Sequence, residues 1–274
     1  MKKLLKRYLP QESIKFLSYL KNWNHKIYSL RDNINFETNL SDFFIWSNDC
    51  CQIEFVAENL RSLITGKRIE VTHNFIFFNE KGEFITNQKY QTSNFFEKIM
   101  LTSPFENPKS KYFSFIHFVD SKTSLNEIFD NFGLKKLYDI CEQNRGYTVY
   151  YPDENKYSGA VVHGNFGGIS KKFLRRVKTN FRKHIYTPIY KFEELENYDL
   201  VFNNPTNSNI LIKIIFNDSD KIINLNIPSL GTKFFSLFNY SGSISFESKL
   251  SICRALIFRN PAPNSKGTFD VFHS

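Results

Sequence analysis

Apolar side chains near the start of the chain recur at helical spacing. After Pro10, the apolar positions are separated by four, three, four and three residues, which places them on one face of a helix. They are Phe16, Leu20, Trp23, Ile27 and Leu30. The pattern predicts an N-terminal helical segment within residues 1–40, whose apolar stripe either packs across a sheet or contacts a second copy of the chain or another partner.

From about residue 41 the pattern changes to short runs in which apolar and polar residues alternate. These runs are rich in aromatic and β-branched residues and are bounded by turn-forming residues, as β-strands are. Residues 80–83 are expected to form a hairpin turn. The predicted strands are residues 43–46, 52–57, 68–78, 83–85, 111–119, 147–151 and 159–163. They make residues 41–165 a first β-rich module.

A second series of short strands follows and predicts another module over residues 191–274. Short strands at turn spacings of about ten residues are typical of an antiparallel sandwich. The predicted strands are residues 199–202, 210–216, 221–227, 233–238, 243–246, 251–258 and 268–272. 

Three features of this second module carry a resemblance. They are the Asn-rich break at residues 203–206, the hairpin at residues 210–227, and the turn at residues 227–232 before the next strand. With these features, residues 196–274 resemble the bacterial immunoglobulin-like modules of the CARDB or fibronectin III type. The resemblance implies a β-sandwich that binds or spaces rather than catalyses.

A faint internal repeat links the two series of strands. Residues 77–85 resemble residues 215–223, and each half ends in a strand that closes on histidine, at His163 and at His273. Two related sandwiches explain this similarity, and chance similarity between hairpins in an Asn-, Phe- and Ile-rich chain explains it equally well. The predicted fold is therefore mainly β, with two tandem antiparallel β-sandwich-like modules, an N-terminal helix and a basic linking helix over residues 166–190.

The charge of the chain is concentrated in one stretch. The protein has 36 Lys+Arg and 27 Asp+Glu, a formal net charge of +9. Between residues 155 and 192 there is no Asp or Glu, and nine basic residues lie there. Without these nine, Lys+Arg equal Asp+Glu in number, so this stretch carries the whole excess and points to an acidic partner.

The predicted linking helix starts at Ser170, a good N-cap after a Gly-rich turn, and ends before Pro188. Free backbone N–H groups at such a helix start favour an anion, although the turn lacks the Gly-Lys-Ser/Thr order of a Walker A loop. The candidate anion-binding residues are Ser170, Lys171, Lys172, Arg175, Arg176, Lys178, Arg182 and Lys183. The alternatives are a solvated connecting helix whose charges meet the acidic residues just downstream, and a helix that lies on a membrane surface.

Other candidate chemistry is sparse. The four cysteines are expected to be free thiols, because their spacing fits no zinc motif. His73, His117 and His163 lie on predicted strands, where a metal site with a carboxylate and ordinary packing are both open. A further set of aromatic residues has two interpretations. They either form an exposed surface that stacks on a sugar or base, or they pack in the core. Its members are Trp46, Tyr147, Tyr150, Tyr151 and Tyr157.

The function predicted from these patterns is a non-catalytic binding or assembly role. Neither a catalytic residue, a metal nor a cofactor is assigned. The expected partner is an anionic polymer or surface, preferably an acidic glycan, or an acidic protein surface. The alternatives are a metal-dependent enzyme acting on a sugar or nucleotide-sugar, with His163 or His273 in its site, and a nucleic-acid-binding protein. No signal peptide and no apolar run of the ~18 residues that span a membrane is recognised, so a cytoplasmic location is expected.

Overall fold

The structure is a computed structural model in which only part of the chain can be described. The described residues are 40–105, 110–133, 146–152, 159–164, 179–204, 209–250, 254–261 and 269–274. Within these ranges the chain is mainly β, with sixteen strands and two short helices. No helix in the described ranges is long and apolar enough to cross a membrane. The predicted N-terminal helix lies outside the described residues.

The first half of the chain contains eight strands and both helices. The strands are β1 (Leu40–Ser47), β2 (Gln52–Glu58), β3 (Val71–Phe78), β4 (Phe84–Thr92), β5 (Phe96–Leu101), β6 (Tyr112–Asp120), β7 (Tyr147–Tyr151) and β8 (Ala160–His163), and the helices are α3 (Leu60–Thr65) and α4 (Leu125–Asn131). All the strands predicted for this half are present with shifted ends, and β5 is a strand that the pattern did not predict.

The second half contains another eight strands. They are β9 (Thr179–Tyr186), β10 (Glu196–Asn203), β11 (Ile210–Phe216), β12 (Ile222–Ile227), β13 (Thr232–Leu237), β14 (Ile244–Leu250), β15 (Leu256–Pro261) and β16 (Asp270–His273). Strand β9 corrects the prediction of a linking helix, because residues 179–186 of that helix form a strand. 

The two halves have the same strand order. The first half forms the sheets β1-β6-β3-β4 and β5-β2-β7-β8, and the second half forms β9-β14-β11-β12 and β13-β10-β15-β16. Adding eight to each strand number of the first half gives the sheets of the second, and all neighbours pair antiparallel. The segments 77–85 and 215–223, which resemble each other in sequence, fall in the equivalent hairpins β3–β4 and β11–β12.

The equivalence of the two halves extends to single hydrogen bonds. Asn59 follows β2, and its backbone N–H donates to the carbonyl of Phe95, directly before β5, at 2.9 Å. Asn204 follows β10, and its N–H donates to Gly231, directly before β13, at 3.0 Å. Both asparagines are fully buried. The same residue type therefore closes the same corner in each half.

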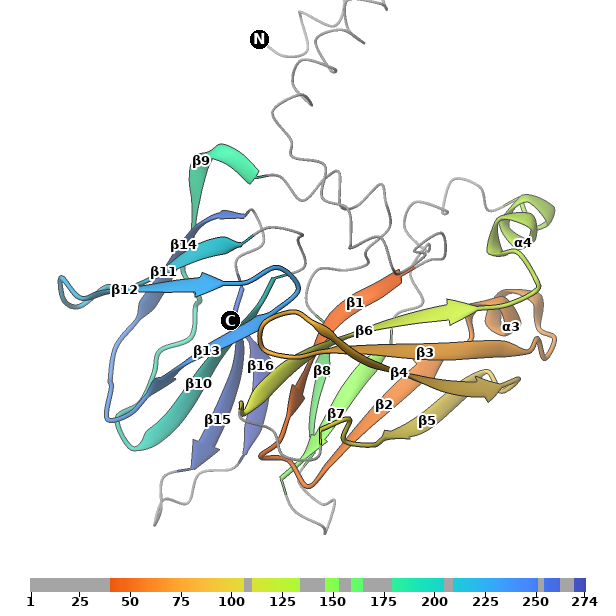
Figure 1. Ribbon diagram of the computed structural model, residues 1–274, viewed down its shortest axis with the longest axis horizontal. Helices are drawn as coiled ribbons and strands as arrows, with labels where there is room; N and C mark the ends of the chain where they lie inside the picture. Colours follow the sequence, from red (N-terminus) through yellow and green to blue (C-terminus); the bar gives the residue numbers. More distant parts are fainter. Residues whose placement is uncertain are drawn as a thin grey trace, which may run out of the picture.

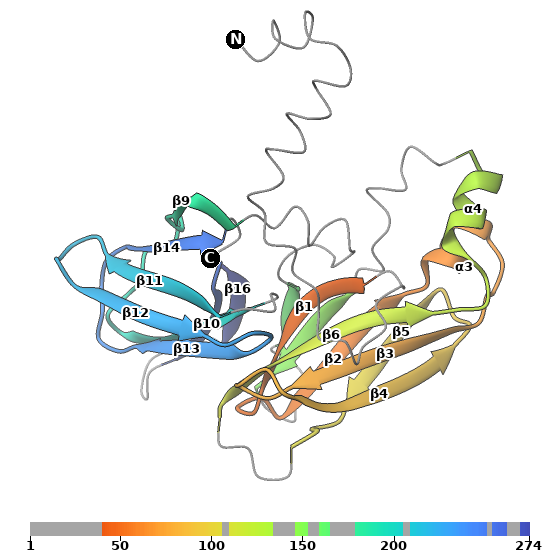
Figure 2. The same ribbon diagram turned by 45° about the horizontal axis from the view of Figure 1, so that its top comes forward.

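The four sheets form a propeller-like ring (Figures 1 and 2), and the expectation of two separate sandwich modules was wrong. The reason is that the sheet β13-β10-β15-β16 is buried on both faces, as the neighbours Leu200 and Val201 of β10 show with 0% exposure each. One face of this sheet packs in the smaller core, around Leu200. The other face belongs to the core of the first half. Its residues there are Val201, Leu256, Phe258 and Val271.

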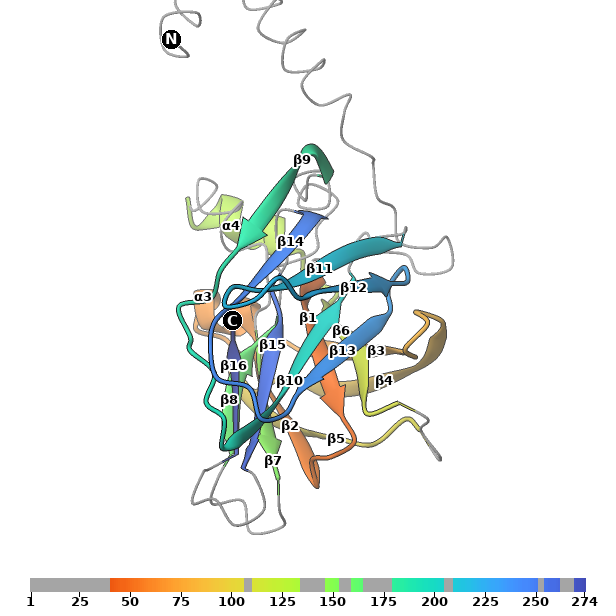
Figure 3. The ribbon, with the colours of Figure 1, turned by 90° about the vertical axis from the view of Figure 1, so that its left-hand side faces the viewer.

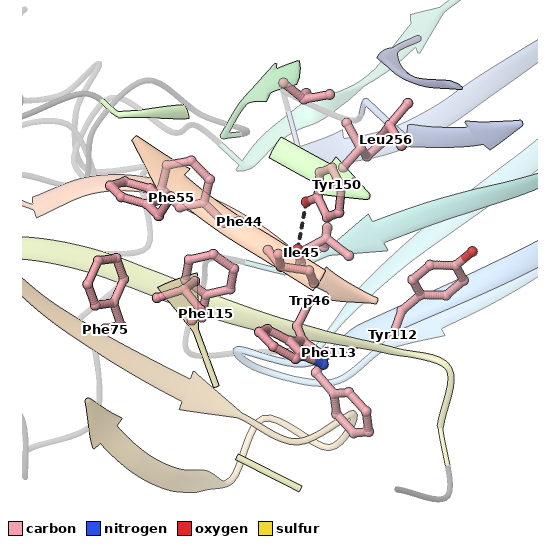
Figure 4. Packing of buried hydrophobic residues seen from close by; sticks show 14 of the residues in the cluster. Phe44, Ile45, Trp46, Phe55, Phe75, Tyr112, Phe113, Phe115, Tyr150 and Leu256 are labelled. Atoms are coloured by element: carbon pink, nitrogen blue, oxygen red, sulfur yellow. Dashed lines mark hydrogen bonds between the residues drawn. The ribbon is translucent and has the colours of Figure 1, made fainter. Parts of the chain in front are cut away.

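Aromatic residues fill the larger core where the halves meet. Phe44 stacks on Phe115 at a centroid distance of 5.2 Å and meets Phe55 edge-on at 5.1 Å. The hydroxyl of Tyr150 donates to the backbone carbonyl of Ile45 at 2.6 Å, and these residues lie close to the second half (Figure 4). This packing holds β1 and β7 against the sheet β13-β10-β15-β16 of the second half.

Two loops also meet across the halves. The turn after β3 contacts the turn before β13, and the backbone N–H of Thr232 donates to Glu80 at 3.3 Å. Gly82 has φ of +80°, and a Cβ built there would lie 1.7 Å from the carbonyl oxygen of Ser229. Only glycine fits this approach. The predicted hairpin turn at residues 80–83 is confirmed, and it serves as a contact between the halves.

Candidate functional site

The structure describes only the end of the predicted anion-binding set. Ser170, Lys171, Lys172, Arg175, Arg176 and Lys178 lie outside the described residues. Arg182 and Lys183 lie in β9, and this strand is an edge of its sheet because it pairs with β14 alone. The set is thus neither brought together nor separated by the described part of the structure.

The apolar spacing explains why β9 was predicted as a helix. Phe181 and Ile185 are four residues apart, which fits one face of a helix, but four is also a multiple of the two-residue period of a strand. Pairing with β14 decides for the strand, with Ile185 opposite Glu247 and Tyr186 opposite Phe246. Successive side chains along a strand point to opposite faces of its sheet rather than around the axis of a helix.

Arg254 lies beside the end of β9. Its guanidinium carbon lies 5.1 Å from the ring centroid of Tyr186, a cation–π contact that holds the side chain against the ring. The hydroxyl of Tyr186 donates to a main-chain oxygen of Ser274. Arg254 is exposed and makes no ion pair with a carboxylate of the described residues. Sequence analysis missed Arg254, because nothing in the local pattern marks it.

His163 and His273 lie together at the junction of the two halves. Each ends its strand, and β8 and β16 run next to each other (Figure 3). His273 is exposed as a residue, yet its pKa is lowered: partial burial of the imidazole has the largest effect, the backbone of His163 opposes the shift, and the charge of Arg254 lowers the pKa further. 

Two residues of the first half flank His163. Its ring lies 5.9 Å from that of Tyr147, edge to face, and its Nδ1 lies 3.4 Å from the carbonyl oxygen of Gly146. Glu58 at the end of β2 is partly buried, which raises the pKa of its carboxyl, and His163 opposes the shift. The junction therefore combines imidazoles, a carboxyl and a guanidinium. The described residues contain no group of three or more His, Cys, Asp or Glu that is able to hold a metal ion.

His73 and His117 form a separate pair inside the first half. The Nδ1 of His73 lies 2.9 Å from the Nε2 of His117, and both residues are buried. Burial lowers the pKa of His73 to about 4. The three histidines singled out in the first half thus divide between two places, because His163 joins His273. The burial of both rings and the lowered pKa of His73 fit core packing.

The aromatic and cysteine candidates also divide. Trp46 and Tyr150 are buried in the larger core, whereas Tyr147 and Tyr151 are partly exposed. Tyr157 lies outside the described residues. Cys50 and Cys51 are free thiols as predicted, and burial raises the pKa of Cys50 to about 12, which suppresses its thiolate form. Cys141 and Cys253 lie outside the described residues.

Comparison with protein-family models and with curated proteins found no match. The resemblance of residues 196–274 to immunoglobulin-like modules stays a prediction.

Proposed function

We propose that this protein is a non-catalytic binding or assembly protein that recognises an anionic polymer or surface, preferably an acidic glycan. The observation that carries the proposal is the distribution of charge along the chain. Nine basic residues and no acidic residue lie between residues 155 and 192, and basic and acidic residues are equal in number elsewhere. A block of one sign attracts a partner of the other sign.

The described geometry supports the proposal at one end of this stretch. The chain leaves the junction of the halves after His163 in β8, and it returns in the edge strand β9. Beside the end of β9, Arg254 adds a further positive charge. Arg254 is exposed, so it is accessible to a long polymer, which needs an open surface rather than an enclosed pocket.

Partly exposed aromatic residues favour a glycan among the anionic polymers. Tyr147 and Tyr151 lie on β7, beside the strand that leads into the basic stretch. Aromatic rings offer flat apolar faces with a polar edge, on which the C–H face of a sugar ring packs. A polymer that carries both acid groups and sugar rings uses both features.

The proposal is tested by titrating the full chain with labelled polygalacturonate, dextran sulfate, single-stranded DNA and neutral dextran over a series of salt concentrations. Binding to the acidic glycans and not to neutral dextran is expected. In a variant with Lys171, Lys172, Arg175 and Arg176 changed to Gln, affinity should fall by more than about tenfold, because several charge-assisted contacts are lost.

A matched control changes four exposed lysines elsewhere to Gln, namely Lys67, Lys81, Lys89 and Lys122. This variant removes the same net charge and should bind within about twofold of the wild type. Equal loss in both variants would overturn the assignment to the basic stretch. Tighter binding of DNA than of the acidic glycans, with a steep salt dependence, would favour the nucleic-acid alternative. Stoichiometric metal together with turnover of a nucleotide-sugar would favour the enzyme.

A further inference from the structure

Strand β12 is an edge of its sheet that no described strand covers. The sheet has the order β12-β11-β14-β9, and β12 pairs with β11 alone. At the start of this pair, the N–H of Phe216 donates to the carbonyl of Lys221 at 3.1 Å, and hydrogen-bonded pairs alternate along an antiparallel ladder. The backbone groups of Ile222, Asn224 and Asn226 therefore point away from β11, toward the open edge.

The edge strands of the other described sheets are protected, as edges in natural proteins usually are, by charged side chains, bulges, short length or cover. Each of the four sheets has two edges, and six of these eight strands contain Asp, Glu, Lys or Arg, namely β1, β4, β5, β9, β13 and β16. A seventh, β8, has four residues and lies next to β16. The eighth is β12, whose sequence Ile-Ile-Asn-Leu-Asn-Ile contains neither charge nor proline. Its register with β11 also runs without a shift, whereas the pairs that contain β1, β4 and β9 each have one.

The side chains of β12 suit a further strand on both faces of the sheet. Ile223 and Leu225 pack against the smaller core, yet both are only partly buried. On the other face Ile222 is 51% exposed, and Asn224 and Asn226 are exposed as well. A strand added here covers apolar surface and satisfies backbone groups, which are the two contributions that stabilise strand pairing.

We propose that β12 pairs with β12 of a second copy of the chain, antiparallel and about a two-fold axis at Asn224. The pairing places Asn224 opposite Asn224 of the second copy, Ile222 opposite Asn226, and Ile223 opposite Leu225. Each outward N–H then meets an outward carbonyl, and no like charges oppose each other. The pairing uses the same edge of both copies and leaves neither open, so assembly stops at a dimer.

The symmetry of the edge argues for a second copy over an unrelated strand. The three residues with outward backbone groups are spaced evenly around Asn224, so the edge is its own complement. On each side of the two-fold axis, the partly buried Ile223 or Leu225 of one copy meets the other residue type of the second copy. The apolar face that packs on the smaller core thus continues across the contact.

The dimer has a defined arrangement of its basic edges. The two sheets join into one of eight strands, in which both copies of β9 are outermost, because β9 is the edge opposite β12. With about 4.8 Å between neighbouring strands, these outer strands lie about 34 Å apart. Since the basic stretch ends in and directly after β9, the dimer presents two such stretches to one long polymer.

The test measures the dimer dissociation constant of the full chain by analytical ultracentrifugation. Asn224→Lys places two positive charges opposite each other at the centre of the pairing, and it should raise this constant by more than about tenfold. Gln91→Lys is the matched control. It adds the same charge at an exposed position of β4, the equivalent edge strand of the first half, and it should stay within about twofold of the wild type.

A proline variant separates loss of pairing from loss of the fold. The N–H of Asn224 points away from β11, so Asn224→Pro removes no bond of the ladder within the chain. It should weaken the dimer by more than about tenfold and keep the circular dichroism spectrum of the wild type. A wild type that is monomeric at every concentration would overturn the proposal, and so would equal dissociation constants in Asn224→Lys and Gln91→Lys.

Amide hydrogen exchange, followed by NMR, locates the contact directly. In the dimer the N–H groups of Ile222, Asn224 and Asn226 should exchange slowly, and in Asn224→Lys those of Ile222 and Asn226 should exchange fast. The N–H groups of Ile223 and Leu225 bond to β11 in both proteins and are internal controls. Fast exchange of the outward groups in a dimeric wild type would assign the dimer to another surface. Slow exchange in the monomeric variant would mean that the chain itself covers the edge, and either result overturns the proposal.

Discussion

The hydroxyl of Tyr112 in β6 donates a 2.7 Å hydrogen bond to the carboxylate of Asp199 in β10, so that the first half supplies a hydrogen-bond donor to a buried acid of the second. Ser236 donates to the same carboxylate at 2.5 Å, and the Nζ of Lys111 lies 2.6 Å from it. Burial and the nearby Asp199 both raise the pKa of Tyr112, which keeps its hydroxyl protonated as a donor. The four residues form a polar clamp between the halves.

Changing Tyr112 to Phe should lower the free energy of unfolding by about 1–3 kcal/mol, because a buried carboxylate loses one of its donors. Urea unfolding, followed by fluorescence, measures the effect. Tyr147→Phe is the control, since Tyr147 is partly exposed and its hydroxyl has no hydrogen bond within the described residues, and it should stay within about 0.5 kcal/mol of the wild type. Equal stability of the two variants would contradict the clamp.

The close approach of the two turns predicts a difference between two glycines of similar backbone conformation. Gly66 and Gly82 have φ of +68° and +80°, but a Cβ at Gly66 meets nothing within 4 Å, whereas one at Gly82 meets the backbone of Ser229. Gly66→Ala should cost about 1 kcal/mol for the left-handed conformation. Gly82→Ala should cost at least about 2 kcal/mol more, because the two turns must separate. Thermal unfolding of both variants measures the two losses of stability. Equal losses would contradict the contact between the two turns.

The His73–His117 pair predicts that stability falls in acid. The folded pKa of His73, about 4, is below the ordinary unfolded value of 6.5, so the unfolded chain binds more protons between these pH values. Stability should therefore be complete above pH 6.5 and decrease as the pH falls toward 4, by about 3 kcal/mol in total. Of the charges near His73, Glu97 opposes the shift and Arg61 increases it.

Measurement of the free energy of unfolding at several pH values checks this prediction. The slope should be reduced in His73→Gln, whose side chain does not titrate. The slope, rather than the absolute stability of the variant, is the readout, since the substitution also changes packing. An identical slope in wild type and variant would assign the acid sensitivity to other groups.

Asn59 and Asn204 occupy equivalent corners, so replacing either one should lower the stability of the protein by a similar amount. The side-chain amide of Asn204 donates to the carbonyls of Ile227 and Pro228, at 3.1 and 2.9 Å. That of Asn59 donates to Ile69 at 2.7 Å, and Asn59 also accepts from the backbone of α3. Asn59→Ala and Asn204→Ala should each lower the free energy of unfolding by about 1–3 kcal/mol.

The control for both asparagine variants is Asn226→Ala, at an exposed position in β12, which should change stability by less than about 0.5 kcal/mol. Because Asn59 and Asn204 share no partner in the described part of the structure, the double variant should show the sum of the two effects. A double variant no less stable than the singles would mean that the two corners do not contribute independently.

Most strands could be predicted because alternation is a local signal. The pattern recovered the hairpins at β3–β4 and β11–β12, whose similarity also marked the equivalent places in the two halves. It missed β5 (Phe96–Leu101), where only Ile99 and Leu101 are buried and the other positions are exposed or partly exposed. It mistook β9 for a helix, because an apolar spacing of four satisfies both periods.

The arrangement of the sheets and the junction site could not be predicted in the same way. The run from Leu200 to Phe202 is apolar without alternation, the pattern of a strand covered on both faces, but it does not say what covers it. His163 and His273 were singled out as strand ends, yet their proximity depends on β8 and β16 lying next to each other. Arg254 lies against the ring of Tyr186, which is distant in sequence.

The sheet that serves both cores has a consequence for how the molecule unfolds. Separating the halves would expose Val201 and its neighbours in the second half, and it would remove one side of the core of the first half. Each half would thus expose apolar surface that the other half covers in the folded protein. Although the two halves repeat one strand order, they should therefore unfold together in a single cooperative transition, with a calorimetric enthalpy equal to the van't Hoff enthalpy.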